Sequence, residues 1–275
     1  MALSNESDRY LATCSEKCKH LSDESLIKIM KWVTEMKVST WLIALPAILA
    51  LWGSSPIPTE SQPVPQGESL QSLPGDPSIQ FNLILPPDYK PEKRHPLLIS
   101  LHGAGGKGAD MIPFWKSAAA KHGVILCCPK SVGVTWSKTD VPRVPRIVEY
   151  LIKTYSIDSR KILLGGFSDG GMFTYCLGLQ RPDLFHYLNP MSGGYTDEFL
   201  RRLPTIQPVP IFITHGRKDD VIPDYSSKKA VNALKRYNFP ITYVEEPNAG
   251  HNMGDFKEYA EKIMQWFLES PGEKK

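Results

Sequence analysis

From residue 79 onward, short apolar runs alternate with longer segments in which apolar residues recur every three or four positions. Runs of four to eight residues are typical of buried strands, and the wider spacing is typical of helices with one buried face. The predicted strands cover residues 79–85, 96–101, 124–128, 162–164, 185–191, 209–214 and 241–245. The predicted helices cover residues 109–121, 141–155, 172–180, 225–237 and 255–269.

This alternation predicts an α/β fold with a mainly parallel central sheet and helices on both faces. Residues 96–101 are almost continuously apolar, as expected of a strand that is covered on both sides. The longest irregular stretch, residues 129–140, is too short to form a helical lid domain. We therefore expect one domain over residues 79–270, with its ligand site open at the carboxyl ends of the strands.

The first 78 residues do not follow the alternation. We interpret residues 1–35 as a polar extension upstream of the natural start, and the Pro- and Ser-rich residues 54–78 as a linker. Residues 36–53 contain an uncharged apolar run that has the length of a signal-peptide core and is short for a membrane span. A cleaved signal predicts an exported protein. The alternative is a signal anchor, which predicts membrane association through residues 38–53.

Composition narrows the function classes. The chain has 275 residues, of which 41% are hydrophobic and 22% charged, values typical of a globular protein. The net charge of +3 is mild and no basic run is interleaved with aromatic residues, so we expect no nucleic-acid partner. The five cysteines lack the paired spacing of a zinc site. We expect neither a metal nor a cofactor.

Between a predicted strand and a predicted helix stands the pattern Gly166-x-Ser168-x-Gly170. It is typical of a nucleophile elbow, a tight turn that holds a strained serine clear of the sheet. Side chains larger than glycine at the flanking positions would clash with the neighbouring strand and helix. The helix behind the turn directs its free N–H groups and its positive dipole end toward an oxyanion. We therefore predict Ser168 as a nucleophile.

A serine hydroxyl needs a base that accepts its proton and a third group that orients the base. Of the seven histidines, His251 lies in the loop after the last predicted strand, just before the closing helix, and is our candidate base. His102 and His215 each end a strand and precede a glycine, so we expect them to fix their turns by hydrogen bonds. Two aspartates follow the preceding strand. The spacing within the turn favours Asp219 as the acid, with Asp220 as the alternative.

An oxyanion hole requires two backbone N–H groups that are fixed in advance. The residue after the nucleophile, Asp169, is predicted to supply one of them. The glycine-rich turn after the second predicted strand supplies the other, from Ala104 or, as second choice, Gly103. Four further residues are candidates to line the substrate pocket: Trp136, Phe167, Tyr195 and Met253.

Three stretches of residues 79–270 resemble the α/β-hydrolase superfamily: the lead-in Leu85-Pro86-Pro87-Asp88-Tyr89 to Leu101-His102-Gly103, the run Gly166-Phe167-Ser168-Asp169-Gly170-Gly171-Met172, and His215-Gly216-x-x-Asp219-x-x-x-Pro223. The order Ser168, Asp219, His251 is that of the superfamily. Within it, the stretches resemble esterases of the polyhydroxybutyrate-depolymerase-like, feruloyl-esterase-like and phospholipase/carboxylesterase group. The resemblance implies that Asp219 is the triad acid.

These observations predict a serine esterase that cleaves small-molecule or polymer-attached carboxylic esters through an acyl-enzyme. A serine peptidase or thioesterase of the same fold is the first alternative. Peptidases of this fold usually carry an elaborate substrate-binding domain, and the sequence has no such segment. The second alternative, a non-catalytic membrane-tethered interaction module, is disfavoured because a nucleophile, a base and an acid are all present.

Overall fold

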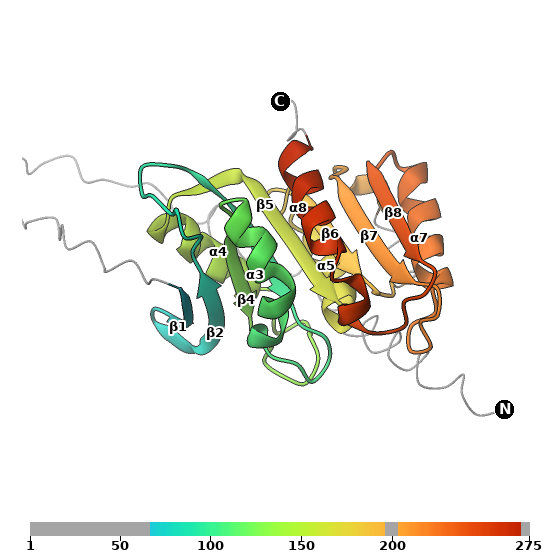
Figure 1. Cartoon of the computed structure of the whole chain (residues 1–275), viewed down its shortest axis with the longest axis horizontal. Helices are drawn as coiled ribbons and strands as arrows, with labels where there is room; N and C mark the ends of the chain where they lie inside the picture. The colour runs from blue at the N-terminus through green and yellow to red at the C-terminus, as the bar shows by residue number, and fades with distance from the viewer. Residues whose placement is uncertain (1–66, 196–202, 271–275) are drawn as a thin grey trace, which may run out of the picture. The chain divides into compact units, whose positions relative to one another are not determined.

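The computed structural model describes residues 67–195 and 203–270 (Figure 1). The polar extension predicted over residues 1–35 and the signal or anchor predicted over residues 36–53 lie outside the described residues. Within the described ranges, no helix is long and apolar enough to cross a membrane.

The described strands form one eight-stranded sheet in the order β1-β2-β4-β3-β5-β6-β7-β8. The strands are β1 (Glu68–Leu73), β2 (Asp76–Ile84), β3 (His95–Leu101), β4 (Ile125–Pro129), β5 (Ile157–Phe167), β6 (Tyr187–Met191), β7 (Ile211–Gly216) and β8 (Ile241–Glu246). All neighbours from β4 to β8 across the sheet are parallel, and only the pairs β1–β2 and β2–β4 are antiparallel. The prediction of a mainly parallel sheet is confirmed.

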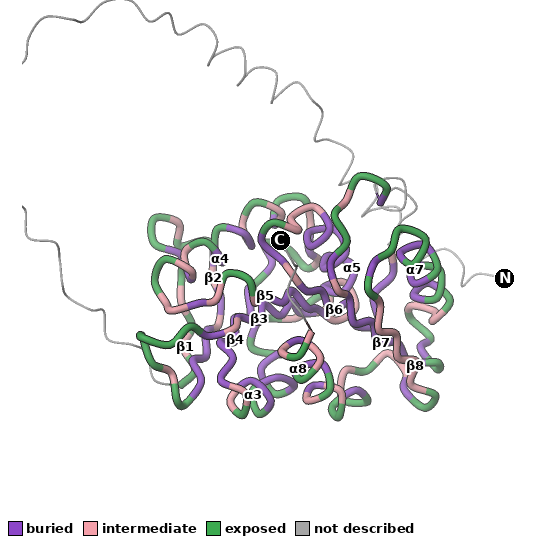
Figure 2. The backbone as a smooth tube through the Cα atoms, turned by 90° about the horizontal axis from the view of Figure 1, so that it is seen from above, coloured by how far each residue is buried: buried purple, intermediate pink, exposed green. Residues whose placement is uncertain are grey.

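Helices cover both faces of the sheet, as predicted: α3 and α8 lie on one face, and α4, α5 and α7 on the other (Figures 1 and 2). The helices are α3 (Ile112–Lys121), α4 (Arg143–Thr154), α5 (Asp169–Gly178), α7 (Tyr225–Arg236) and α8 (Tyr259–Glu269), with short 3₁₀ turns η1 (Gly108–Met111), η2 (Leu203–Thr205) and η3 (Met253–Phe256). In α4 the buried residues Val144, Ile147, Val148 and Leu151 recur at the spacing of one helix face. This apolar stripe is what holds α4 against the sheet.

The core lies between the two helical layers, along the central strands (Figure 2). Leu98 and Ile99 in β3, and Leu163 and Leu164 in β5, have no exposed surface. Neighbouring side chains on a strand point to opposite faces, so complete burial of both members of each pair requires cover on both faces. This rigid centre carries the turns that follow β3 and β5.

The linker predicted over residues 54–78 extends too far, because residues 68–73 form β1 and β2 begins at Asp76. The strand β1 lies at the sheet edge, pairs only with β2, and leaves Leu70 67% exposed. An edge strand with little buried surface needs few apolar residues, so its polar sequence resembles a linker. The sheet domain therefore begins near Glu68 rather than at residue 79.

A partly buried lysine fixes the closing helix to the sheet. From β5, Lys161 places its Nζ atom 3.2, 3.1 and 2.8 Å from the carbonyl oxygens of Phe267, Leu268 and Ser270, at the end of α8. The same Nζ atom is 3.0 Å from the Tyr187 hydroxyl. Burial lowers the pKa of Lys161. A cation at this point satisfies carbonyls that have no partner within the helix and favours the negative end of its dipole.

We expect Lys161→Met, which keeps the apolar stem and removes the donors, to lower the free energy of unfolding by about 2 kcal/mol. Urea denaturation at neutral pH measures this change. The matched control is Lys121→Met, because Lys121 makes a surface ion pair with Glu261 and its side chain is 63% exposed. The control should cost no more than about 0.5 kcal/mol. Equal effects of the two substitutions would contradict the anchoring role of Lys161.

Candidate active site

The turn between β5 and α5 holds Ser168 in a strained backbone conformation, with φ 55° and ψ −117°. A Cβ atom on Gly166 would lie 2.4 Å from the carbonyl of Gly170, and one on Gly170 would lie 2.4 Å from the carbonyl of Leu101. Glycine is therefore required at both positions, for the steric reason expected from the sequence. The N–H of Ser168 donates to the carbonyl of Met191 at 2.9 Å, which ties the strained residue to the next strand.

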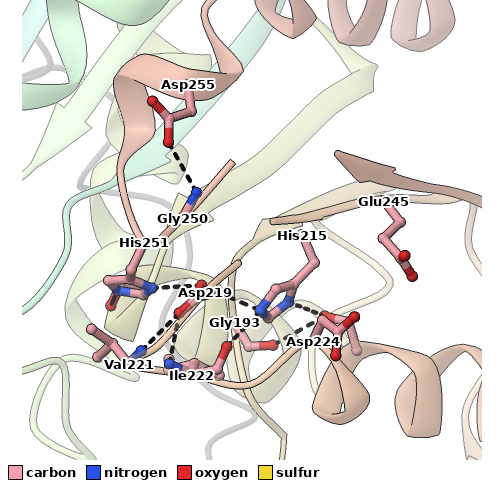
Figure 3. A network of polar contacts seen from close by, with 12 residues as sticks. Gly193, His215, Asp219, Val221, Ile222, Asp224, Glu245, Gly250, His251 and Asp255 are labelled. Carbon is pink, nitrogen blue, oxygen red and sulfur yellow. Dashed lines mark hydrogen bonds and ion pairs between the residues drawn. The ribbon is translucent and has the colours of Figure 1, made fainter. Parts of the chain in front are cut away.

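Three loops at the carboxyl ends of β5, β7 and β8 bring the predicted nucleophile, acid and base together. The Oγ atom of Ser168 is 2.8 Å from Nε2 of His251. The Nδ1 atom of the same imidazole is 2.8 Å from Oδ2 of Asp219 (Figure 3). These are hydrogen-bond distances, and both ring nitrogens of His251 are engaged. The geometry fits an imidazole that is oriented by one side chain and accepts a proton from the other.

The side chain of Asp219 has no exposed surface, yet its environment favours the charged form. Burial alone would raise the pKa of Asp219, but bonds from two histidines and a backbone N–H hold it well below its ordinary value. The N–H groups of Val221 and Ile222 donate to Oδ1 at 3.0 and 2.8 Å, and Nε2 of His215 lies 3.3 Å from Oδ2 (Figure 3). The alternative acid, Asp220, is exposed.

His215 fixes its turn, as predicted. Its Nε2 atom is 2.7 Å from the carbonyl oxygen of Ile222, which can only accept, so Nε2 carries the proton. Its Nδ1 atom is 2.7 Å from Oγ of Ser227 and accepts from that hydroxyl. A chain of polar contacts thus runs from Ser227 through His215 to Asp219, and on through His251 to the nucleophile.

The acid loop and the base loop are also joined directly. The N–H of Lys218 donates to the carbonyl of Ala249 at 2.9 Å, and the N–H of Gly250 donates to the Asp255 carboxylate at 3.0 Å (Figure 3). A Cβ atom on Gly216 would lie 2.4 Å from the Ala249 carbonyl. Only glycine permits this approach, which explains the glycine that follows His215.

The predicted oxyanion turn lies beside the nucleophile. A Cβ atom on Gly103 would lie 3.5 Å from Cβ of Ser168. The N–H of Gly106 donates to the Gly103 carbonyl at 3.0 Å and closes the turn that contains Ala104. On the other side, Asp169 stands in the first turn of α5, where backbone N–H groups have no partner within the helix. The arrangement can present the N–H groups predicted as oxyanion donors, of Asp169 and of Ala104 or Gly103.

The four predicted pocket residues have different surroundings. Trp136 is 4% exposed and its ring stacks on that of Phe173, so it takes part in internal packing. Phe167 is partly buried, with its ring 5.0 Å from that of His251. Met253 is partly buried against the core, and the ring of Tyr195 lies 5.7 Å from the Lys229 ammonium. Among the four, Phe167 is the one in contact with the proposed base.

The sequence indicated only an irregular stretch over residues 129–140, whereas the structure has an ordered loop between β4 and α4. It is closed by Asp140, which is 1% exposed and accepts from the N–H groups of Val132 and Ser137 at 2.9 Å each. The pattern Ser137-x-x-Asp140 ahead of a helix is the local signal that could have indicated an ordered turn.

The eight-stranded, mainly parallel sheet, the serine elbow and the chain order Ser168, Asp219, His251 are features of the α/β-hydrolase fold. Comparison with known proteins agrees with this class. Residues 137–255 match the family model described as Phospholipase/Carboxylesterase. The chain has the α/β-hydrolase fold and is similar to esterases.

Two similar curated proteins are fungal. The bifunctional acetylxylan esterase/xylanase XynS20E of Neocallimastix patriciarum is 34% identical over 139 residues, which are 46% of this chain and 20% of that protein. The probable feruloyl esterase C of Aspergillus flavus is 26% identical over 192 residues, which are 65% of this chain and 70% of that protein. The chain thus spans only about a fifth of the first relative.

Solved structures share the fold. A thermostable esterase has a TM-score of 0.61 and 24% identity, with 74% of this chain and 62% of that chain covered. The S-formylglutathione hydrolase FrmB of Staphylococcus aureus has a TM-score of 0.61 and 16% identity, with 74% of this chain and 99% of that chain covered.

The depressed pKa of Asp219 predicts a pH-dependent contribution to stability. An aspartate in an unfolded chain titrates near 3.9. Because the folded-state pKa of Asp219 is lower, its carboxylate contributes stability above about pH 4, which is lost as the pH falls from there through the folded pKa. Urea denaturation should therefore show a large difference in the free energy of unfolding between the native protein and Asp219→Asn at pH 7, and a smaller difference at pH 3.

The exposed neighbour supplies the control for this measurement. Asp220→Asn should leave the free energy of unfolding nearly unchanged at both pH values, because Asp220 is exposed. If Asp219→Asn lowers the free energy of unfolding as much at pH 3 as at pH 7, the electrostatic explanation is contradicted.

Proposed function

We propose that this protein is a serine hydrolase that cleaves carboxylic esters, with Ser168 as nucleophile, His251 as general base and acid, and Asp219 as the group that orients His251. The observation that carries the proposal is the continuous pair of 2.8 Å contacts from Ser168 through His251 to Asp219. A strained serine, an oriented imidazole and a buried carboxylate have no need to coincide in a purely structural turn. Support for ester chemistry comes from the esterase relatives.

In the first half-reaction, Nε2 of His251 removes the proton from Ser168 as Oγ attacks the acyl carbon of the ester. The carbonyl oxygen becomes an oxyanion that accepts hydrogen bonds from the N–H of Asp169 and from Gly103 or Ala104. Each such donor contributes about 10²–10³ to the rate in comparable enzymes. The intermediate collapses when the C–O bond to the alcohol breaks, and the imidazolium returns its proton to the leaving alkoxide.

In the second half-reaction, water replaces the alcohol. His251 takes a proton from the water, whose oxygen attacks the acyl-enzyme, and then returns the proton to Ser168 as the carboxylic acid leaves. Throughout, the low pKa of Asp219 keeps a negative charge beside Nδ1, which stabilises the transient imidazolium. No external electron donor or acceptor is needed for either half-reaction.

Acyl groups carried on a polymer are the substrate class that we favour. One relative is described as an acetylxylan esterase/xylanase, a name that refers to acetyl groups on the polymer xylan, and another as a probable feruloyl esterase. Among residues 67–195 and 203–270, no segment between strands has the size of a lid domain, so a bulky alcohol component could approach Ser168. The exposed side chains of Val132, Val134 and Val221 lie on the loops beside the oxyanion turn and the acid.

Substitution of the nucleophile tests the activity. Ser168→Ala should fold normally and hydrolyse p-nitrophenyl acetate and methyl ferulate about 10⁶-fold more slowly than the native protein. The matched control is Ser159→Ala, an exposed serine in β5, which should keep native rates. A fluorophosphonate should label the native protein and the control, but not Ser168→Ala.

Two outcomes would overturn the proposal. The first is activity of Ser168→Ala above about a tenth of the native rate, because a triad without its nucleophile loses far more than that. The second is turnover of a peptide anilide by the native protein in the absence of ester turnover, which would favour the peptidase alternative.

Export of the protein forms a second part of the proposal. In this proposal, residues 36–53 serve as a cleaved export signal for the domain that follows. The support is sequence pattern alone: a short apolar run after a basic residue, followed by small residues.

Mass spectrometry of the native N-terminus tests export. The mature protein should begin between about Gly53 and Gln62, with no peptide N-terminal to Trp52. Peptides from residues 1–30 in soluble cytosolic protein would contradict export. The same peptides found only in the membrane fraction would favour the anchor.

A further inference from the structure

The loop that joins β4 to α4, residues 130–142, is bonded to the predicted oxyanion turn at three points. The indole Nε1–H of Trp136 donates to the His102 carbonyl at 2.8 Å. The N–H of Gly105 donates to the Val134 carbonyl at 2.7 Å. The N–H of Ser131 donates to Nε2 of His102 at 3.2 Å. The turn after β3 is therefore held from outside by a segment of chain that contributes no triad residue.

The same loop is bonded to the other side of the proposed oxyanion hole. The backbone N–H of Trp136 donates to the Asp169 carboxylate at 2.7 Å. The Trp136 ring stacks on Phe173 of α5 at 5.4 Å and lies 4.9 Å from the His102 ring. One buried residue thus contacts the two segments that carry the predicted oxyanion donors, which are about 65 positions apart in the sequence.

Because a peptide group is planar, a hydrogen bond to its carbonyl also orients its N–H group, which here is a predicted oxyanion donor. The His102 carbonyl and the Gly103 N–H belong to one planar peptide group, so fixing the carbonyl fixes the direction of the N–H. A bond accepted by the carbonyl also polarises the N–H of the same group and makes it a stronger donor. The next peptide is held in the same way, because Nδ1–H of His102 donates to the Gly103 carbonyl at 2.7 Å, opposite the N–H of Ala104.

The tautomer and the surroundings of His102 fit this role. Because the Gly103 carbonyl and the Ser131 N–H engage the two ring nitrogens, the ring is neutral with its proton on Nδ1. Burial lowers the pKa of His102, which keeps the ring neutral. The His102 carbonyl also has little room to move, because a Cβ atom on Gly170 would lie 2.6 Å from it.

The loop itself is ordered by its own polar groups. Besides the bonds that close it at Asp140, Oγ of Ser131 donates to the Gly133 carbonyl at 2.6 Å. The loop can fix the oxyanion turn only if it is itself ordered, because a mobile loop would lose conformational entropy with each hydrogen bond that it formed.

We propose that Trp136 is a positioning residue for the oxyanion hole: its indole N–H orients the His102–Gly103 peptide, and its backbone N–H fixes Asp169 at the start of α5. Trp136 touches neither the substrate nor the reacting atoms. It acts by holding donors from two segments at the separation that the tetrahedral intermediate requires. This inference rests on the proposed ester hydrolysis, since that reaction forms the oxyanion that these donors would stabilise.

The first test replaces the indole and keeps the aromatic packing. Trp136→Phe should lower kcat for p-nitrophenyl acetate about 10- to 100-fold and change KM less than about two-fold, because only the intermediate needs the donors. The inhibition constant of benzeneboronic acid, which forms a tetrahedral adduct with serine, should rise by the same factor as kcat/KM falls. The acid limb of the pH–rate profile should stay in place, because the contacts of His251 are untouched.

A matched tryptophan separates positioning from stability. Trp115 is fully buried, and its indole N–H donates to Oγ of Ser100 at 2.8 Å, but it lies in α3, which carries neither a triad residue nor a predicted oxyanion donor. Trp115→Phe should lower the free energy of unfolding at least as much as Trp136→Phe, with kcat and boronate inhibition within about two-fold of native.

Two substitutions of Asp169 test the hydrogen bond between the Trp136 backbone N–H and the Asp169 carboxylate. Asp169→Ala removes the acceptor for the Trp136 N–H and should lose kcat and boronate affinity in parallel. Asp169→Asn keeps an acceptor oxygen and should recover most of that loss. This pair also keeps the inference testable if Trp136→Phe does not fold.

The outcomes distinguish this inference from the proposed function. If the native protein hydrolyses no ester, the proposed function fails. If the native protein is active and Trp136→Phe keeps its kcat and boronate affinity, or loses activity only through KM, the positioning role is overturned. Parallel losses in Trp115→Phe and Trp136→Phe, or equal losses in Asp169→Ala and Asp169→Asn, would overturn it as well.

Discussion

The close approach of backbone to backbone around Ser168 is the constraint on which the rest of the structure depends. No side chain fits at Gly166 or Gly170, where a Cβ atom would lie 2.4 Å from a carbonyl group. Strand β5 and helix α5 therefore meet in a turn that places Ser168 at φ 55°. Such strain costs of order 1–3 kcal/mol, and it persists because β5 is buried at the centre of the sheet.

The second requirement is a buried negative charge that stays ionised. Removing the Asp219 carboxylate from water is unfavourable, and the chain offsets this cost with donors that arrive from several directions. Two backbone N–H groups come from its own loop, and two imidazoles come from the end of β7 and the loop after β8. The loop that holds Asp219 and the loop that holds His251 are consequently joined by polar contacts. They approach each other where Gly216 permits contact with Ala249.

The two halves of the site are built differently. The proposed triad is joined by side-chain contacts that meet at Asp219, whereas the proposed oxyanion turn is held by bonds that the carbonyls of His102 and Gly103 accept. Histidines take part in both, and among the histidines that the structure describes only His251 has a ring nitrogen bonded to Ser168. His102 and His215 differ from it because each has both ring nitrogens occupied by structural partners.

The sequence by itself determined the strand–helix alternation, the elbow, and the residues that meet as Ser168, Asp219 and His251. These depend on local signals: apolar periodicity, glycine spacing, and position after a strand. It did not determine β1, because an edge strand that exposes Leu70 lacks an apolar run. Nor did it determine the surroundings of Trp136, whose hydrogen-bond partners lie 34 and 33 positions away in the sequence. Only tertiary structure decides such cases, because burial depends on which distant segments pack together.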